Sequence, residues 1–235
     1  MRARTRIRKL INTLGIDIHR HIKRPDKLDV LKQFDIKTVL DIGANIGQSA
    51  FEFRALLPHA YIYSFEPLPD CFKKLTKAMS TDVHFKAFSF ALGAEDAQAS
   101  INKSSYDQAS SLMEMADAHK QAMPHTAGVA GSVIVEVKRL DDVAKNLTLV
   151  PDMLIKMDVQ GFENQVIQGG QETIRKAKVV LIENSFVELY VGQALFDDIY
   201  EKMKSLGFTY QGALSQKYDP TNGNILFEDS LFVRP

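Results

Sequence analysis

The sequence of 235 residues contains one cysteine, Cys71, so an internal disulfide is impossible and a reducing compartment is expected. It lacks any apolar run near the roughly 18 residues that a membrane-spanning helix requires. The N-terminus has the charged part of a signal peptide, but Asn12, Gly15 and Asp17 interrupt the apolar core that should follow. We therefore expect a soluble, cytoplasmic protein.

The chain also has no formal net charge, because its 29 basic and 29 acidic residues cancel. This balance gives no general argument for a nucleic-acid partner. The charge is unevenly spread, however. Residues 1–24, called the basic leader below, contain eight Lys or Arg and a single acid, Asp17. The leader could contact an anionic carrier or rest peripherally on an anionic membrane surface. It could equally be a solvated helix that covers the sheet.

Strands and helices alternate after a helical N-terminal segment of residues 1–34. The hydrophobic content of 45% suffices for one core, so residues 35–235 are predicted to form a single domain. Alternation at this spacing predicts βαβ units, a parallel sheet and therefore an α/β fold. The strands are expected at 38–42, 60–66, 83–92, 152–159 and 178–185, and the helices at 46–57, 69–80, 163–177 and 194–207.

Two stretches depart from the alternation. Residues 97–139 contain two short strands around a long polar segment, which predicts a hairpin-like insertion, and long loops in compact domains are often functional. The last two strands, 208–214 and 224–234, have no helix between them and should form an antiparallel pair.

The segment "VLDIGANIGQS" carries glycines between the first strand and the first helix. Gly43, Ala44 and Gly47 let the backbone approach a ligand, and the helix N-terminus offers unpaired N–H groups. A dinucleotide site would prefer G-x-G-x-x-G, but the middle glycine is replaced by Asn45.

Acidic residues at two strand ends point to a particular ligand. Asp41 would repel a phosphate and attract an ammonium or sulfonium group. Glu66, followed by Pro67, is placed to accept both hydroxyls of a ribose. An adenosine with a cationic tail and no phosphate describes S-adenosylmethionine, whose adenine would stack near Ala91 and Leu92. The alternative is a tight turn with two incidental acids and ordinary strand-end packing.

A second polar cluster follows the buried strand before Asp158. With Glu183, one strand later, it could act as a general base or hold a divalent metal such as Mg²⁺. The alternative is a helix cap and a salt bridge. Ser111 could bind the cofactor's carboxylate or cap a helix. His125 could reach the site if the long loop closes, although a solvated loop histidine is the simpler interpretation.

The chain resembles the FkbM-type methyltransferases in "VLDIGANIGQ", "YSFEPLPDCFKKL", "LIKMDVQGFENQVIQGG", "VVLIEN" and "DSLFVR", over roughly residues 36–234. The resemblance implies a three-layer, Rossmann-like class I methyltransferase with a seven-stranded sheet, usually one that O-methylates a sugar or polyketide-like hydroxyl. It implies cofactor contacts at Asp41, Gly43, Asn45, Gly47 and Glu66, and a reacting centre at Asp158.

Many members of that family have glutamate where this chain has Gln160, so the chemistry is placed on Asp158 instead. The main hypothesis is an O-methyltransferase acting on a small-molecule or glycan hydroxyl. The alternatives are an NAD-dependent oxidoreductase and a non-catalytic S-adenosylmethionine-binding module. A nucleic-acid enzyme fits poorly because the chain has no Asn-Pro-Pro-Tyr type motif for a flipped base.

Overall fold

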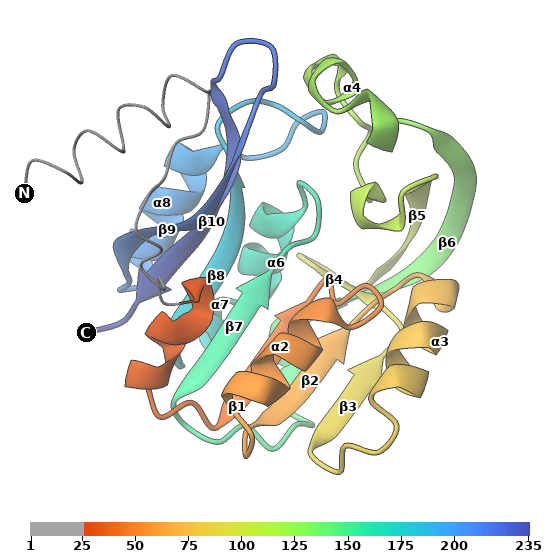
Figure 1. The fold of residues 1–235 in the computed structure, drawn as a ribbon. Coiled ribbons are helices and arrows are strands. Elements are labelled where there is room, and N and C mark those ends of the chain that lie inside the picture. Colours follow the sequence, from red (N-terminus) through yellow and green to blue (C-terminus); the bar gives the residue numbers. More distant parts are fainter. Residues whose placement is uncertain (1–25) are drawn as a thin grey trace, which may run out of the picture.

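A computed structural model describes residues 26–235, and it has a seven-stranded sheet at its centre (Figure 1). The strand order is β3-β2-β1-β7-β8-β10-β9, with the first five strands parallel and β10 antiparallel to both of its neighbours. In that order the strands are Phe85–Phe88, Tyr61–Phe65, Thr38–Ile42, Met153–Met157, Ala177–Ser185, Ile225–Val233 and Thr209–Tyr218. The predicted class I methyltransferase sheet with an antiparallel C-terminal hairpin is confirmed.

The two faces of this sheet are covered by different helices, which makes three layers. One face packs on η1 (Lys27–Gln33), α2 (Gln48–Leu56) and α3 (Pro69–Ala78). The other packs on α6 (Glu163–Gly169), α7 (Gln171–Ile174) and α8 (Phe196–Ser205). The central strands β1 and β7 are therefore covered on both sides, which explains their nearly continuous apolar sequences.

The insertion forms a small second sheet in the order β4-β6-β5. Strands β5 (Ala97–Ser104) and β6 (Val129–Arg139) are antiparallel, as the predicted hairpin requires, and β4 (Ala91–Gly93) pairs with β6 in parallel. Between β5 and β6 lie η2 (Asp107–Ala109), α4 (Asp117–Ala122) and η3 (Pro124–Thr126), and α5 (Leu140–Ala144) follows β6. The insertion stands beyond the carboxyl ends of the large sheet (Figure 1).

Two predicted elements were wrong in their extent. The strand expected at 83–92 is divided between β3 and β4, which belong to different sheets. The helix expected at 163–177 is divided into α6 and α7 at Gly169 and Gly170. A Cβ on Gly169 would lie 1.9 Å from the carbonyl oxygen of Gly93, so the glycine lets α6 approach the backbone of β4.

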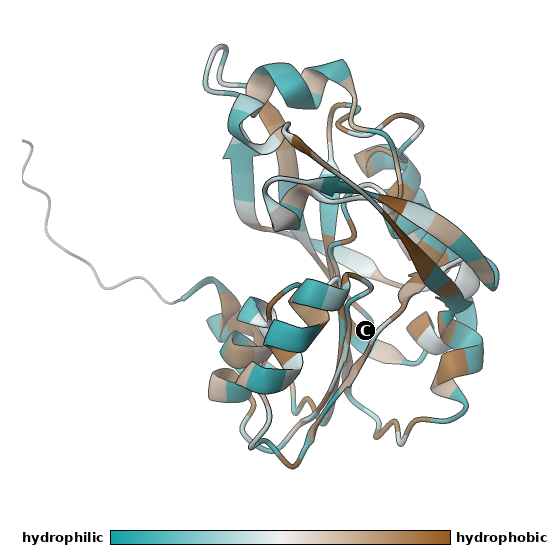
Figure 2. Cartoon of the chain, turned by 90° about the vertical axis from the view of Figure 1, so that its right-hand side faces the viewer, coloured by the Kyte–Doolittle hydropathy of each residue, from teal (hydrophilic) through white to brown (hydrophobic). Residues whose placement is uncertain are grey.

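Buried apolar residues fill the space between these layers. In the hydropathy colouring of Figure 2, the outward turns of the helices are mostly hydrophilic. Leu28 and Leu31 of η1 pack into the core beneath α2, although the sequence placed them in the N-terminal segment. The basic leader lies outside the described residues. Within residues 26–235, no helix is both long and apolar enough to cross a membrane.

Candidate functional site

The strand order reverses between β1 and β7, and a cavity of about 290 Å³ opens there at the carboxyl ends of the strands. The insertion forms its far wall. Every predicted cofactor residue except Asp41 and Gly47 lines the cavity, and so do both predicted catalytic residues. The lining members of those predictions are Gly43, Ala44, Asn45, Glu66, Pro67, Ala91, Leu92, Ser111, Asp158 and Glu183.

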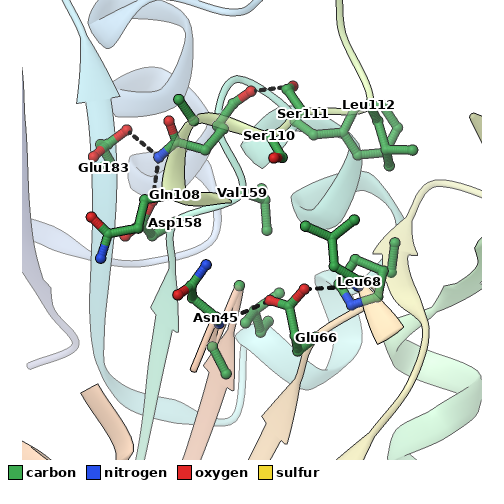
Figure 3. A pocket seen from close by; sticks show the side chains of 18 of the residues that line it. Asn45, Glu66, Leu68, Gln108, Ser110, Ser111, Leu112, Asp158, Val159 and Glu183 are labelled. Atoms are coloured by element: carbon green, nitrogen blue, oxygen red, sulfur yellow. Dashed lines mark hydrogen bonds between the residues drawn. The ribbon is translucent and has the colours of Figure 1, made fainter. Parts of the chain in front are cut away.

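Glu66 lies on the floor of the cavity and is fixed by the backbone (Figure 3). One carboxylate oxygen accepts the backbone N–H of Asn45 and the other that of Leu68, both at 2.8 Å. Burial raises the pKa of Glu66 to about 7, although these two hydrogen bonds favour the charged form. Because each carboxylate oxygen can accept more than one hydrogen bond, Glu66 can still receive two hydroxyl groups of a ligand.

The glycine loop after β1 lines the cavity and also has a structural role that was not predicted. Gly43 has a φ of +81°, and a Cβ there would lie 1.9 Å from the carbonyl oxygen of Asp158. The missing side chain thus lets the ends of β1 and β7 come together. Gly47, with a φ of +102°, forms the N-cap of α2 behind the cavity.

The interpretation that Asp41 points into the crevice is wrong. Its side chain is fully buried on the face of the sheet covered by η1 and α2, because alternate residues of a strand face opposite sides. There it accepts a hydrogen bond from Ser64 Oγ at 3.0 Å, and its Oδ1 lies 3.8 Å from Lys156 Nζ. Burial raises the pKa of Asp41, and the Lys156 ammonium opposes that shift.

Lys156 lines the cavity, and the sequence interpretation missed it because a residue within an apolar strand is expected in the core. Its Nζ lies 3.2 Å from Asp158 Oδ2 and donates to the carbonyl of Gly43 at 3.3 Å. Burial alone would lower the pKa of Lys156, but the carboxylates of Asp158 and Asp41 raise it above its ordinary value. A single charged residue inside a buried strand, two residues before Asp158, was the feature of the sequence that could have indicated it.

Asp158 and Glu183 lie together on one side of the cavity, across from Glu66 (Figure 3). The amide nitrogen of Gln160 joins them, donating to Asp158 Oδ1 at 2.7 Å and to Glu183 Oε1 at 3.1 Å. The hydroxyl of Tyr190 donates to the amide oxygen of the same glutamine at 2.8 Å. Burial raises the pKa of Glu183 well above its usual range, and the neighbouring Asp158 adds to the shift.

Ser111 lines the upper wall, where its hydroxyl donates to the backbone carbonyl of Gln160 at 2.6 Å and accepts the N–H of Met113. The hydroxyl therefore ties the insertion to the segment that carries the carboxylates. It has one acceptor position left for a ligand.

His119, rather than His125, lines the cavity from the insertion. The ring Nε2 lies 2.8 Å from Thr126 Oγ1, which itself donates to the carbonyl of Met123. The imidazole must then be the donor in the first contact. Burial lowers the pKa of His119, which favours the neutral ring. The exposed His125 does not reach the cavity, and no spacing in the sequence distinguished the two histidines.

The divalent metal considered from the sequence has no support in the geometry. Within residues 26–235, no three His, Cys, Asp or Glu side chains are grouped so that they could hold a metal ion. The two carboxylates that might have done so are joined by an amide.

Similarity to solved structures is limited to a distant resemblance. Aeropyrum pernix fibrillarin with bound S-adenosyl-L-methionine is 12% identical, with a TM-score of 0.49, and the match covers 87% of this chain and 72% of that one. The magnesium protoporphyrin IX methyltransferase of Synechocystis PCC 6803 is also 12% identical, with a TM-score of 0.47 and 98% and 96% coverage. Neither is similar enough to locate a residue of this protein.

Sequence comparison is more specific. The family described as Methyltransferase FkbM domain matches residues 41–210. The 2-O-methyltransferase NoeI of Sinorhizobium fredii (strain NBRC 101917 / NGR234) is 30% identical over 204 residues, covering 85% of this chain and 82% of that protein. Methyltransferase sdnD of Sordaria araneosa is 26% identical, with 72% and 73% coverage. The chain belongs to the FkbM family and is an S-adenosylmethionine-dependent methyltransferase.

Proposed function

We propose that the protein O-methylates a hydroxyl of a sugar or of a related polysaccharide or natural-product acceptor. The observation that carries this proposal is the placement of Glu66 on one side of a single cavity and of Asp158 with Glu183 on the other. The first suits an adenosine ribose, and the second suits removal of a proton from an alcohol. The resemblance to a protein named as a 2-O-methyltransferase supports the choice of oxygen.

Three groups of residues would hold S-adenosylmethionine. Glu66 would accept the ribose hydroxyls, while Ala91 and Leu92 would lie beside the adenine together with Pro67. The loop of Gly43, Ala44 and Asn45 and the hydroxyl of Ser111 would line the amino-acid end. Asp41 and Gly47 would contribute without lining the cavity. Asp41 would hold Lys156 in place, and Gly47 begins α2.

The cofactor, when bound, supplies a methyl group activated by a sulfonium. The protein must place the acceptor oxygen in line with that methyl group and take its proton. Asp158 and Glu183 are carboxylates within the cavity that can take the acceptor's proton, and the ammonium of Lys156 lies beside Asp158. A non-catalytic module would have no use for this arrangement.

A second cavity of about 140 Å³ gives the acceptor a route to the same carboxylates. It shares Ser49, Lys156, Asp158 and Glu183 with the first. Its other lining residues come from η1, α2, β7, β8, β9 and β10, among them Lys27, Glu52 and Asp229. An in-line transfer needs donor and acceptor on opposite sides of the methyl group, and two cavities that meet at the carboxylates provide this. Lys27 lines this second cavity and follows Arg24, the last residue of the basic leader, by three positions in the sequence, so an acceptor linked to an anionic carrier remains part of the proposal.

The test is incubation with methyl-labelled S-adenosylmethionine and a panel of sugar acceptors, each run with and without EDTA. We expect label on a hydroxyl oxygen, with no loss in EDTA. Calorimetric titration with S-adenosylmethionine and with NADH accompanies it. Tight binding of the first and none of the second is expected, whereas binding without transfer to any member of the panel would contradict the proposed sugar acceptor.

A further inference from the structure

Gln160 is held at both ends of its side chain inside the candidate site. Its amide nitrogen contacts Asp158 and Glu183, while its amide oxygen accepts the hydroxyl of Tyr190. Its backbone has a φ of +56°, which is uncommon for a residue with a side chain and is followed by Gly161 at +95°. The glutamine thus occupies a conformation that the surrounding chain must maintain.

The carboxylates and Tyr190 together set which way the amide faces. Charged Asp158 and Glu183 can only accept hydrogen bonds, so the NH₂ group of Gln160 is directed to them and its amide oxygen to Tyr190. Burial raises the pKa of the Tyr190 phenol, so its hydroxyl keeps its proton, for which the amide oxygen at 2.8 Å is a nearer acceptor than the carbonyl of Ala109 at 3.3 Å. Tyr190 packs closely against Gly161, because a Cβ added to Gly161 would lie 2.9 Å from the Cβ of Tyr190.

The number of hydrogens in this bridge matters. An amide NH₂ offers two, one for each carboxylate, so both acids can be charged while both hydrogen bonds persist. A glutamic acid at position 160 could offer at most one. Asp158 has a further partner in Lys156, whereas Glu183 forms no ion pair among the described residues. The two carboxylates are therefore not equivalent.

We propose that Gln160 is a positioning residue that presents Glu183 as the proton acceptor and leaves Asp158 as a fixed charge paired with Lys156. This inference rests on the proposed O-methylation. The acceptor's O–H proton passes to a Glu183 oxygen. The acceptor oxygen bonds to the methyl carbon, and the C–S bond breaks with its electron pair left on sulfur. Burial raises the pKa of Glu183, so its carboxylate is a stronger base than an ordinary glutamate.

Other groups around Glu183 bear on its protonation and must stay constant in any test. They come from the end of β7, from α6, β10, α2 and η1, and from the loop after β8: Asp158, Lys156, Glu163, Asp229, Glu52, Lys27 and Tyr190. Replacing Gln160 leaves every one of these residues in the chain, and of them only Asp158 and Tyr190 form hydrogen bonds with its side chain.

The first experiment needs neither cofactor nor acceptor. Carbon-13 NMR of carboxyl-labelled protein follows the titration of Glu183, assigned with Glu183→Gln. In Gln160→Glu we expect the Glu183 midpoint to rise by about one pH unit or more, because a hydrogen is lost and a like charge is added. Gln98→Glu adds the same charge at an exposed position that lines neither cavity and should leave the midpoint unchanged. Equal midpoints in wild type and Gln160→Glu would overturn the inference.

The second experiment measures turnover with the best acceptor of the sugar panel. Glu183→Gln should lower kcat about 10²–10⁴-fold. Tyr190→Phe should lower kcat with little change in acceptor KM, and Gln160→Glu should move the rising limb of the pH–rate profile to higher pH. Turnover of Glu183→Gln within tenfold of wild type would contradict the assignment. Absence of S-adenosylmethionine binding to the wild type would refute the proposed function instead, independently of the NMR result.

Discussion

The two sides of the cavity hold their carboxylates by different means. Glu66 is fixed by two backbone N–H groups, whose positions follow from the course of the chain after β1 and β2. Asp158 and Glu183 are fixed by side chains, namely Gln160 and Lys156. A site built on the backbone resists substitution of its neighbours, whereas one built on side chains can be retuned by one change. The side of the cavity that carries Asp158 and Glu183 is therefore the side that a single substitution can alter.

Lys156→Met should produce the largest loss of stability. The substitution leaves Asp41 fully buried with no cation beside it, since Ser64 alone would remain as its partner. Breaking a buried ion pair in this way costs about 3–5 kcal/mol in the free energy of unfolding. Urea denaturation measures it. Adding Asp41→Asn to the variant should restore most of the stability, and a double variant as unstable as the single one would show that the charge of Asp41 is not the cause.

Gly43→Ala should come next and tests the contact between β1 and β7. A φ of +81° costs an alanine about 1–3 kcal/mol, and the Cβ would also meet the carbonyl of Asp158 at 1.9 Å. Gly131→Ala is the matched control, because Gly131 has a φ of +116° but no atom within 4 Å of an added Cβ. The difference between the two variants in urea denaturation isolates the clash. Equal losses would mean that the strand ends can separate freely.

The central sheet could be predicted from the sequence. The alternation of strands and helices predicted it because hydrophobic periodicity depends on local burial. The split of residues 83–92 and the break at Gly169 depend on contacts between β4 and α6, distant in sequence, so no local pattern contained them. The carboxylates of the site were predicted because strand ends collect at one edge.

The order of side chains within the site could not be predicted. Asp41 was expected in the crevice and lies behind it, because the direction of a strand-end side chain depends on the face that α2 covers. The ion pair of Lys156 could not be predicted, because it requires Asp41 to lie beside it on the neighbouring strand. His119 lines the cavity and His125 does not, and that difference is decided by the turn between α4 and η3.

Glu66→Gln tests the backbone-built side through cofactor affinity. An amide cannot accept the N–H groups of both Asn45 and Leu68, so one buried donor loses its partner and the ribose loses an acceptor. A lost hydrogen bond of this kind costs about 1–3 kcal/mol, or roughly 5- to 150-fold in Kd. Calorimetry with S-adenosylmethionine measures the change. Glu52→Gln, in the second cavity only, should leave the affinity unchanged, and equal effects would refute the assignment of the ribose to Glu66.

The smallest expected effect is the dependence of stability on pH. Burial raises the pKa of both Glu66 and Glu163 to about 7 in the folded protein, while Asp41 and Asp158 respectively add to the shifts. The folded state therefore binds protons more tightly than the unfolded chain between about pH 4.5 and 7, and the free energy of unfolding must fall as the pH rises through that window. We expect a loss of about 1–2 kcal/mol per group, after allowing for relaxation around each carboxyl. Urea denaturation from pH 5 to 8 should show this slope, and Glu163→Gln should make it shallower, because the raised pKa values of Glu66, Glu183 and Asp41 continue to contribute to it. A stability that rises with pH over the same range would mean that the hydrogen bonds from Val159 and Gly161 outweigh the burial of Glu163.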